Sequence, residues 1–538
     1  MHLTTSNPGP NTRGGRRKRV GGRAARIKER SRGTTGEVVR PGLSGGQYRP
    51  LSDTDIQRIY ETALDLLECV GIGDPLPEIL HYALPRGCRV DDDNRLHFPR
   101  TLVEDLIGIS AKEYTRYAPD PANDLEVRGT DVLFTTAGEA VTILDFETKK
   151  FRPTTLIDLY DATRLADQLE HIHSFGQPFI AADYSGDTFI HDVNVAYAQL
   201  AGTKKSFSLG VANVDHIEPL IALFDEYLGE EGGFLKRPFC IFSGCPIVSP
   251  LRFAKDNAQM LVKVAELGLT CDVAVAPQAG ATSPAALAGT LVQCFAETLA
   301  CLCVVNLIRP GSVINFGMWP FISDLRTGSF SGGSGEEALI SAATVQICNH
   351  FDLITCVGTG MTDAKTMDVQ AGYEKALTTV TAALAGCNLI GAYPGIVGSL
   401  IGQSFEGMVI DNDMIGNVQR ILRGIEVTDE TLSYEVIKNT VSGTGHYLGS
   451  QQTLDLMHSE YLYPDLADRS APGAWESLGN KNLYEQAHER VHEMLESYYP
   501  TYINAAADAR IRSKFPIELN PNDMRKGNGR WSFGERFR

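Results

Sequence analysis

Leu353–Ala376, which reads LITCVGTGMTDAKTMDVQAGYEKA, is the stretch of sequence that decides the fold. It begins as an apolar run that ends at Gly358, continues as a polar loop, and then enters a helix-like run. Barrel enzymes repeat this unit and place their polar active-site groups where the strands end. The unit recurs several times along the chain and predicts an enzyme. The alternative at this place is that Asp363 and Asp368 only cap the following helix.

Strand-like and helix-like runs alternate between residues 158 and 420. The strand candidates are His173–Phe175, Phe207–Leu209, Phe239–Phe242, Asp272–Ala276, Val313–Phe316, Leu353–Val357 and Leu389–Ala392. An eighth strand is expected near Phe179–Ala182 or further along the chain. The helix-like runs include Ala254–Glu266, Pro284–Ala300, Glu336–His350 and Tyr373–Leu384. This alternation implies parallel strands and predicts an α/β fold, a closed (β/α)8 TIM barrel. A doubly wound open sheet is the alternative.

The predicted barrel core, residues 158–420, has additions on both sides. Residues 1–40 hold eleven Lys or Arg, which predicts a basic, disordered arm that is either solvated or grips an acidic partner or a neighbouring subunit. Residues 41–157 contain helical spacing, as at Ile56 and Ile59, and then short strands, which predicts an N-terminal helical region with a small β element. Residues 421–538 are expected to form a C-terminal helical extension with a basic tail.

Composition excludes several classes of protein. The 538-residue chain is 43% hydrophobic and carries a net charge of −17, which argues against nucleic-acid binding. The most apolar run, Cys294–Ile308, contains Glu297 and Asn306 and predicts a buried helix followed by a turn, so no membrane span is expected. The eleven cysteines lie mostly in apolar runs, and no secretory signal pattern is present. We therefore expect reduced thiols in the cytoplasm and no metal site.

Polar and aromatic residues gather where the predicted strands end. Trp319 and Phe321 stand near Asp324, an arrangement that would attract a quaternary ammonium cation, unless the two rings only anchor the loop. Tyr184, Tyr393 and Gln278 follow other strands. Gly328–Gly335 is rich in glycine but lacks the lysine of a phosphate-binding loop, so it predicts a mobile active-site loop.

Taken together, these residues resemble the trimethylamine methyltransferase family, which includes the glycine betaine methyltransferases. The resemblance covers nearly the whole chain. It is carried by an ordered set of short matches: Arg40–Leu43, Gly45–Gly46, Tyr48–Ser52, Ala63–Asp65, Val70–Ile72, Thr362–Lys365, Gln370–Lys375, Ser404–Glu406, Asp411, Arg423–Ile425 and Glu430–Leu432.

The resemblance implies a TIM barrel that moves a methyl group from a methylated amine to the cobalt of a separate corrinoid protein. The corrinoid is then carried by this cognate partner and is not tightly bound to the chain itself. Trimethylamine enzymes of methanogens carry pyrrolysine in the barrel mouth, a place that falls near Gly328–Gly335 here. The sequence shows no pyrrolysine. It therefore resembles the pyrrolysine-free branch, whose substrates are quaternary amines such as glycine betaine.

Methyl transfer from a quaternary amine needs no group on the enzyme to activate the substrate. A quaternary nitrogen is already positive, so its methyl group is a competent electrophile. The protein has only to bind, desolvate and orient the cation. We predict catalytic roles for Asp363, Glu374 and Lys365. We predict that the substrate contacts Trp319, Phe321, Tyr184, Tyr393 and Gln278. We also predict that Lys365, Arg326 and the amides of Gly332 and Gly333 are candidates to bind the carboxylate of a betaine.

Two other interpretations stay open at this point. One is a barrel lyase or hydrolase that uses Asp363 and Glu374 as acid and base. The other is a betaine-binding or scaffold barrel without turnover. A homo-oligomer is expected in each case.

Overall fold

The computed structural model describes residues 38–184, 186–391, 393–443 and 445–532. The chain forms two compact units, of which one comprises Val39–Gly424 and Pro464–Arg538 and the other Met1–Val38 and Ile425–Tyr463. Nearly all of the predicted basic arm, the end of the basic tail, and Ala392 at the end of one predicted strand lie outside the described residues.

An eight-stranded sheet forms the centre of the larger unit. Its order is β1 (Leu43–Ser44), β7 (Asp131–Thr135), β20 (Leu389–Gly391), β19 (Thr355–Gly358), β16 (Ile314–Gly317), β14 (Cys271–Val273), β11 (Cys240–Gly244) and β10 (Phe207–Gly210). In this sheet, β1 pairs antiparallel with β7, and every other pair of neighbouring strands is parallel. The mixed α/β fold and the parallel pairing predicted from the alternating pattern are confirmed.

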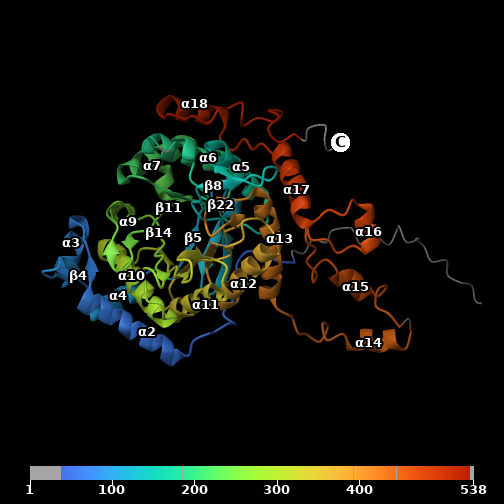
Figure 1. The fold of residues 1–538 in the computed structure, drawn as a ribbon, viewed down its shortest axis with the longest axis horizontal. Coiled ribbons are helices and arrows are strands. Elements are labelled where there is room, and N and C mark those ends of the chain that lie inside the picture. The colour runs from blue at the N-terminus through green and yellow to red at the C-terminus, as the bar shows by residue number, and fades with distance from the viewer. Residues whose placement is uncertain (1–37, 185, 392, 444, 533–538) are drawn as a thin grey trace, which may run out of the picture. The chain divides into compact units, whose positions relative to one another are not determined.

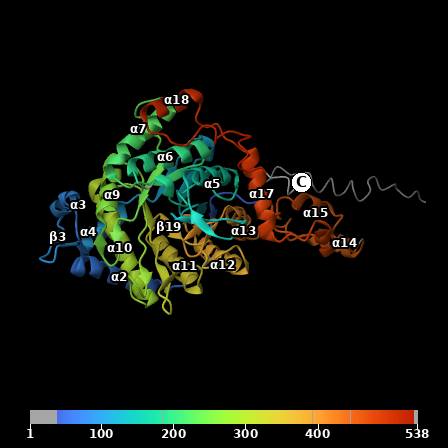
Figure 2. The ribbon, with the colours of Figure 1, turned by 45° about the horizontal axis from the view of Figure 1, so that its top comes forward.

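Helices lie around the outside of this curled sheet in two views (Figure 1, Figure 2). They are α5 (Leu156–Gln168), α6 (Thr188–Gly202), α7 (Ile217–Leu228), α9 (Lys255–Leu267), α10 (Leu287–Ile308), α11 (Gly335–His350), α12 (Val369–Ala385) and α13 (Phe405–Arg423). Local chemistry sets their ends. The Asp368 side chain accepts hydrogen bonds from two amides at the start of α12, and Gly386 ends that helix with a φ of 89°. The capping role considered for Asp368 is thus confirmed.

The most apolar helix, α10, contains the run Cys294–Ile308. Among the described residues it is the one helix long and apolar enough to cross a membrane, and most of it is buried inside the protein. Glu297, within this helix, is buried and accepts hydrogen bonds from Ser249 and the Leu251 amide. The helix therefore packs in the core, as its polar residues predict.

The main sheet takes strands from the N-terminal region. β6 (Leu125–Arg128), β8 (Thr142–Leu144) and β9 (Phe151–Pro153) form small antiparallel pairs, but β7 pairs with β20. Val132–Phe134 is buried, as expected of a central parallel strand with both faces covered. The domain boundary predicted near residue 157 therefore separates β7 in sequence from strands that share its sheet.

No eighth strand forms at Phe179–Ala182 within the described chain. Phe179 makes a single bridge to Ala140, and a 3-10 turn, η4, spans Ala182–Tyr184. The segment 173–175 instead makes two parallel bridges, one from Ser174 to Thr135 of β7 and one from Phe175 to Phe207 of β10.

Helices from both ends of the chain belong to the larger unit. Helix α2 (Asp53–Asp65) begins at a capping box formed by Ser52 and Asp55, and it packs against α10. At the other end of the chain, α17 (Leu483–Ser497) packs against α13, and α18 (Ala505–Lys514) packs against α7. Both predicted additions thus contain helices.

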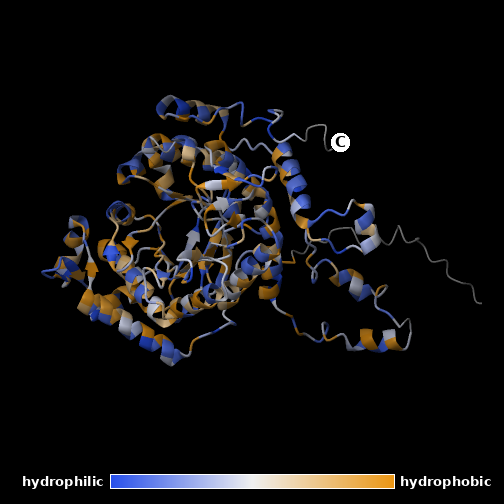
Figure 3. Ribbon diagram, in the orientation of Figure 1, coloured by the Kyte–Doolittle hydropathy of each residue, from blue (hydrophilic) through white to orange (hydrophobic). Residues whose placement is uncertain are grey.

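In the smaller unit, Ile425–Tyr463 contains α14 (Tyr434–Val441) and α15 (Gln451–Leu456). Figure 3 shows apolar residues along α14, and the side chains of Tyr434, Ile437 and Val441 are exposed.

Candidate functional site

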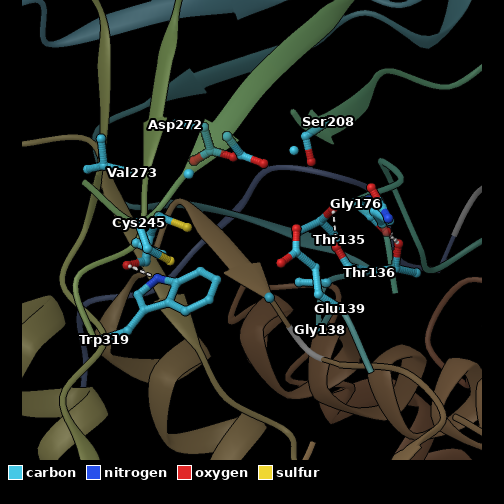
Figure 4. A pocket seen from close by; sticks show the side chains of 18 of the residues that line it. Thr135, Thr136, Gly138, Glu139, Gly176, Ser208, Cys245, Asp272, Val273 and Trp319 are labelled. Atoms are coloured by element: carbon cyan, nitrogen blue, oxygen red, sulfur yellow. Dashed lines mark hydrogen bonds between the residues drawn. The ribbon is translucent and has the colours of Figure 1, made fainter. Parts of the chain in front are cut away.

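A cavity of about 600 Å³ lies at the carboxyl ends of the parallel strands. Its lining comes from residues in or just after β7, β10, β11, β14, β16 and β20, and Figure 4 shows many of these side chains. Parallel α/β folds place their ligands at this edge of the sheet. The cavity is therefore the candidate active site.

One wall of the cavity is aromatic. Trp319 follows β16, and its indole N–H donates a hydrogen bond of 3.1 Å to the carbonyl oxygen of Cys356. The ring centroid of Trp319 lies 6.0 Å from that of Tyr393 and 6.3 Å from that of Phe321. A Cβ atom at Gly358 would come within 2.7 Å of the Tyr393 hydroxyl and 3.0 Å of the Trp319 ring. The glycine that ends β19 thus lets the two rings meet.

The facing side of the cavity carries two carboxyl groups. Asp272 lies on β14 and Glu139 lies in the loop after β7, and both point into the same space as the Trp319 indole (Figure 4). Desolvation raises the pKa of both groups, although the charge of Arg116 opposes the effect at Asp272 and that of His191 opposes it at Glu139. The Glu139 side chain is exposed, and it lines the cavity.

The backbone holds Glu139 in an unusual conformation. Its φ of 56° is in the left-handed region, which non-glycine residues rarely adopt. The Glu139 amide donates a hydrogen bond to the carbonyl of Gln177, and the next amide, of Ala140, donates to the carbonyl of Pro178. A Cβ atom at Gly210 would lie 2.8 Å from Glu139 Oε1. Such over-determined strain is typical of residues placed for function.

The cavity lining contains further charged groups. Arg116, on β5 (Glu113–Arg116), is buried and donates a hydrogen bond of 3.0 Å from Nε to Ser206 Oγ. Asp192, on α6, accepts hydrogen bonds from the Ala212 amide and from His216. Both acids and bases therefore line the site.

Cys245 also faces the cavity, immediately after β11. Burial, together with the nearby Glu139 and Asp272, raises the pKa of its thiol to about 12. The thiolate is the nucleophilic form of cysteine, so Cys245 is not poised to attack a substrate at neutral pH.

The predicted catalytic residues come together, but not at the cavity. The Asp363 carboxylate accepts hydrogen bonds from Ser331, the Gly332 amide and Ser399. Glu374, buried on α12, accepts from Thr362 Oγ and the Asp363 amide, and Lys365 is exposed. None of the predicted catalytic residues lines the cavity. These contacts join neighbouring loops, and the catalytic roles remain predictions.

The predicted substrate-binding residues divide into two groups. Trp319, Phe321 and Tyr393 line the cavity. The remaining predicted residues lie outside its lining: Tyr184, Gln278, Arg326, Gly332 and Gly333. Arg326 is exposed and pairs with Asp324 at 2.7 Å.

The glycine-rich segment is packed in this structure. Its Ser329–Ser331 part is strand β18, which pairs antiparallel with β17 (Phe321–Asp324). A Cβ atom at Gly332 would lie 2.7 Å from Met361, and one at Gly333 would lie 2.5 Å from Glu374. The following helix, α11, begins at Gly335, capped by Ser334.

The described residues hold no group of three or more His, Cys, Asp or Glu side chains that could bind a metal ion. All eleven cysteines are free, and nine of them are buried. The burial of most cysteines agrees with the prediction from the sequence.

Residues 16–516 match the family model described as trimethylamine methyltransferase (MTTB). The chain belongs to this family. The trimethylamine methyltransferase family is a family of enzymes, so the predicted enzyme class, methyltransferase, is confirmed together with the resemblance seen in the sequence.

The chain is also similar to individual methyltransferases. The chain is 28% identical over 469 residues to glycine betaine methyltransferase of Desulfitobacterium hafniense (strain Y51), covering 87% of this chain and 96% of that one. It is 31% identical over 472 residues to trimethylamine methyltransferase MttB of Methanosarcina barkeri, covering 86% and 94%. The crystal structure of M. barkeri monomethylamine methyltransferase (MtmB) aligns with 12% identity and a TM-score of 0.46, covering 87% and 91%.

Proposed function

We propose that this chain moves a methyl group from a small methylated ammonium cation to the cobalt of a separate corrinoid protein. The observation that carries the proposal is the cavity itself, which the ring of Trp319 lines together with the carboxyl groups of Glu139 and Asp272. Membership of the trimethylamine methyltransferase family supports the reaction class, and homologues carry the names of methyltransferases for glycine betaine and trimethylamine.

The residues of the cavity suit a quaternary nitrogen. Aromatic faces attract such a cation through the negative face of the ring, most strongly for tryptophan. The carboxyl groups offset its charge, which cannot be lost by deprotonation. Breaking the C–N bond then leaves a neutral amine, and the bonding electron pair stays on nitrogen. The cavity binds, desolvates and orients the cation, while cob(I)alamin on the partner supplies the nucleophile that accepts the methyl group.

We further propose that the curled sheet closes into the (β/α)8 barrel expected from the sequence. The segment 173–175 would be the closing strand, because Ser174 pairs with β7 and Phe175 pairs with β10, both in parallel. The strands β10, β11, β14, β16, β19, β20 and β7 would supply the other seven places. The aromatic and acidic cavity would then occupy the barrel mouth, where a partner protein can approach.

We also propose a pyrrolysine-free site, a cytoplasmic location and a homo-oligomeric state, as expected from the sequence. The buried free thiols support a reducing compartment. No observation favours the lyase or hydrolase interpretation, because Asp363 and Glu374 lie outside the cavity lining.

Replacing Trp319 by alanine should raise the dissociation constant for tetramethylammonium about 2- to 30-fold, because a desolvated cation–π contact contributes about 0.5–2 kcal/mol. Isothermal titration calorimetry measures the change. Trp475→Ala is the matched control, since Trp475 lies on α16 (Pro472–Ser477) and does not line the cavity. If Trp319→Ala leaves the dissociation constant at its wild-type value, Trp319 does not contact the cation.

A further inference from the structure

We propose that the cavity selects methylated ammonium cations that carry no acidic group, and that Glu139 is the counter-ion responsible for this selection. The inference rests on the proposed function and names the substrate class of the same site. It differs from the expectation of a betaine, whose carboxylate would need a donor inside the cavity.

The charged side chains of the cavity favour a cation over a zwitterion. Glu139, Asp192 and Asp272 line it, against one arginine, Arg116, and one histidine, His191. The charge of Arg116 already acts on Asp272. A substrate carboxylate that entered this space would therefore meet like charges, which disfavour binding.

The donors predicted for a substrate carboxylate lie elsewhere. Lys365 donates to the Asp363 carbonyl, and Arg326 pairs with Asp324 at the surface. The Gly332 amide donates to the Asp363 carboxylate. Each of these donors has a partner in the protein, and none lines the cavity.

Glu139 is the acid in the cavity that is best suited to pair with a ligand. Among the described residues, none donates a hydrogen bond to its carboxylate, whereas Asp192 accepts hydrogen bonds from His216 and Ala212. The strained backbone at Glu139 and the close approach to Gly210 fix the direction of the side chain. A carboxylate that lines the cavity without a donor from the protein is available to a ligand, and a bound cation would supply its partner.

Titration of Glu139 should make cation binding depend on pH. Desolvation raises the pKa of Glu139, so its neutral form is favoured as pH falls. The other titratable residues that line this space are Arg116, His191, Asp192, Cys245, Asp272, Cys356 and Tyr393. A bound cation favours the ionised carboxylate. The cation should therefore bind more weakly as pH falls through the pKa of Glu139, and binding below that pKa should release a proton.

Calorimetry on the full chain tests the inference with choline, tetramethylammonium and glycine betaine, each in two buffers of different ionisation enthalpy. We expect choline and tetramethylammonium to bind at least about tenfold more tightly than glycine betaine. Glu139→Gln should weaken choline binding about tenfold. It should also reduce the difference in affinity between choline and glycine betaine, and remove the proton release. Asp272→Asn is a second cavity variant, in case Glu139→Gln does not fold, and it should also weaken choline binding. Glu104→Gln, an exposed glutamate on α4 (Arg100–Ile109), is the matched control.

The results of calorimetry and of a methyl-transfer assay distinguish failure of this inference from failure of the proposed function. Glycine betaine binding as tightly as choline, or choline binding that is unchanged in Glu139→Gln, would overturn the inference, even if methyl transfer to cobalt occurs. Tight betaine binding that is lost in Arg116→Gln would overturn it by assigning a carboxylate partner. Selective, Glu139-dependent choline binding with no methyl transfer to any corrinoid would support the inference and refute the proposed function. Failure of all three compounds to bind would overturn the inference.

Discussion

Replacing Lys375 by methionine is expected to lower the free energy of unfolding by about 3–5 kcal/mol, because it leaves Asp411 charged and unpaired in the core. Lys375 Nζ lies 3.0 Å from Asp411 Oδ2, and both side chains are almost fully buried. The same ammonium donates to the carbonyl oxygens of Gly360 and Tyr393, and Asp411 accepts from the Gly395 amide. The pair thus stabilises the fold and fixes the turn that carries Tyr393.

Chemical denaturation followed by circular dichroism measures this change. Lys263→Met is the matched control, because Lys263 forms a surface ion pair with Glu218, and exposed pairs contribute little. The double variant Lys375→Met/Asp411→Asn should recover part of the loss, since it removes both charges. Equal unfolding free energies for Lys375→Met and Lys263→Met would show that the buried pair does not stabilise the fold.

Methyl transfer is expected to depend completely on a corrinoid acceptor. With no corrinoid, the methylated substrate should remain intact. Free cob(I)alamin should support slow transfer, and a cognate corrinoid protein should be at least about 100-fold faster, because small errors in the placement of reacting groups already cost about that factor. The absorbance change of the corrinoid on methylation, together with release of the demethylated amine, measures both rates.

Tetrahydrofolate provides the contrasting acceptor. Robust demethylation of the substrate with tetrahydrofolate alone would overturn the proposed acceptor while leaving the substrate assignment standing. A protein that binds the cation and transfers nothing, even to a cognate corrinoid protein, would be the binding or scaffold barrel considered from the sequence.

Periodicity was enough to predict most of the fold. The runs Glu336–His350 and Tyr373–Leu384 became α11 and α12, because long apolar periodicity at helical spacing has few other solutions. β7 was assigned to a separate β element because its partner, β20, is distant in sequence. Pairing between distant strands is a tertiary property that no local pattern carries.

Only some residues of the candidate site could be predicted from the sequence. Trp319 and Tyr393 could be found because each follows a clear strand, and parallel strands end at one edge. Asp272 had a signal, since it is a lone acid inside the apolar run CDVAVA. Glu139 had little signal, because its position depends on the left-handed turn after β7 and on contacts with Gln177 and Gly210.

A crystal structure of the protein with tetramethylammonium, determined without any corrinoid, tests the central claim most directly, because methyl transfer cannot occur in that complex. We expect the nitrogen to lie within about 6 Å of the Trp319 ring centroid. We also expect the cation to share the cavity with Glu139 and Asp272. A cation bound away from Trp319, for example beside Asp363 and the Gly332–Gly333 segment, would show that this cavity is not the cation site.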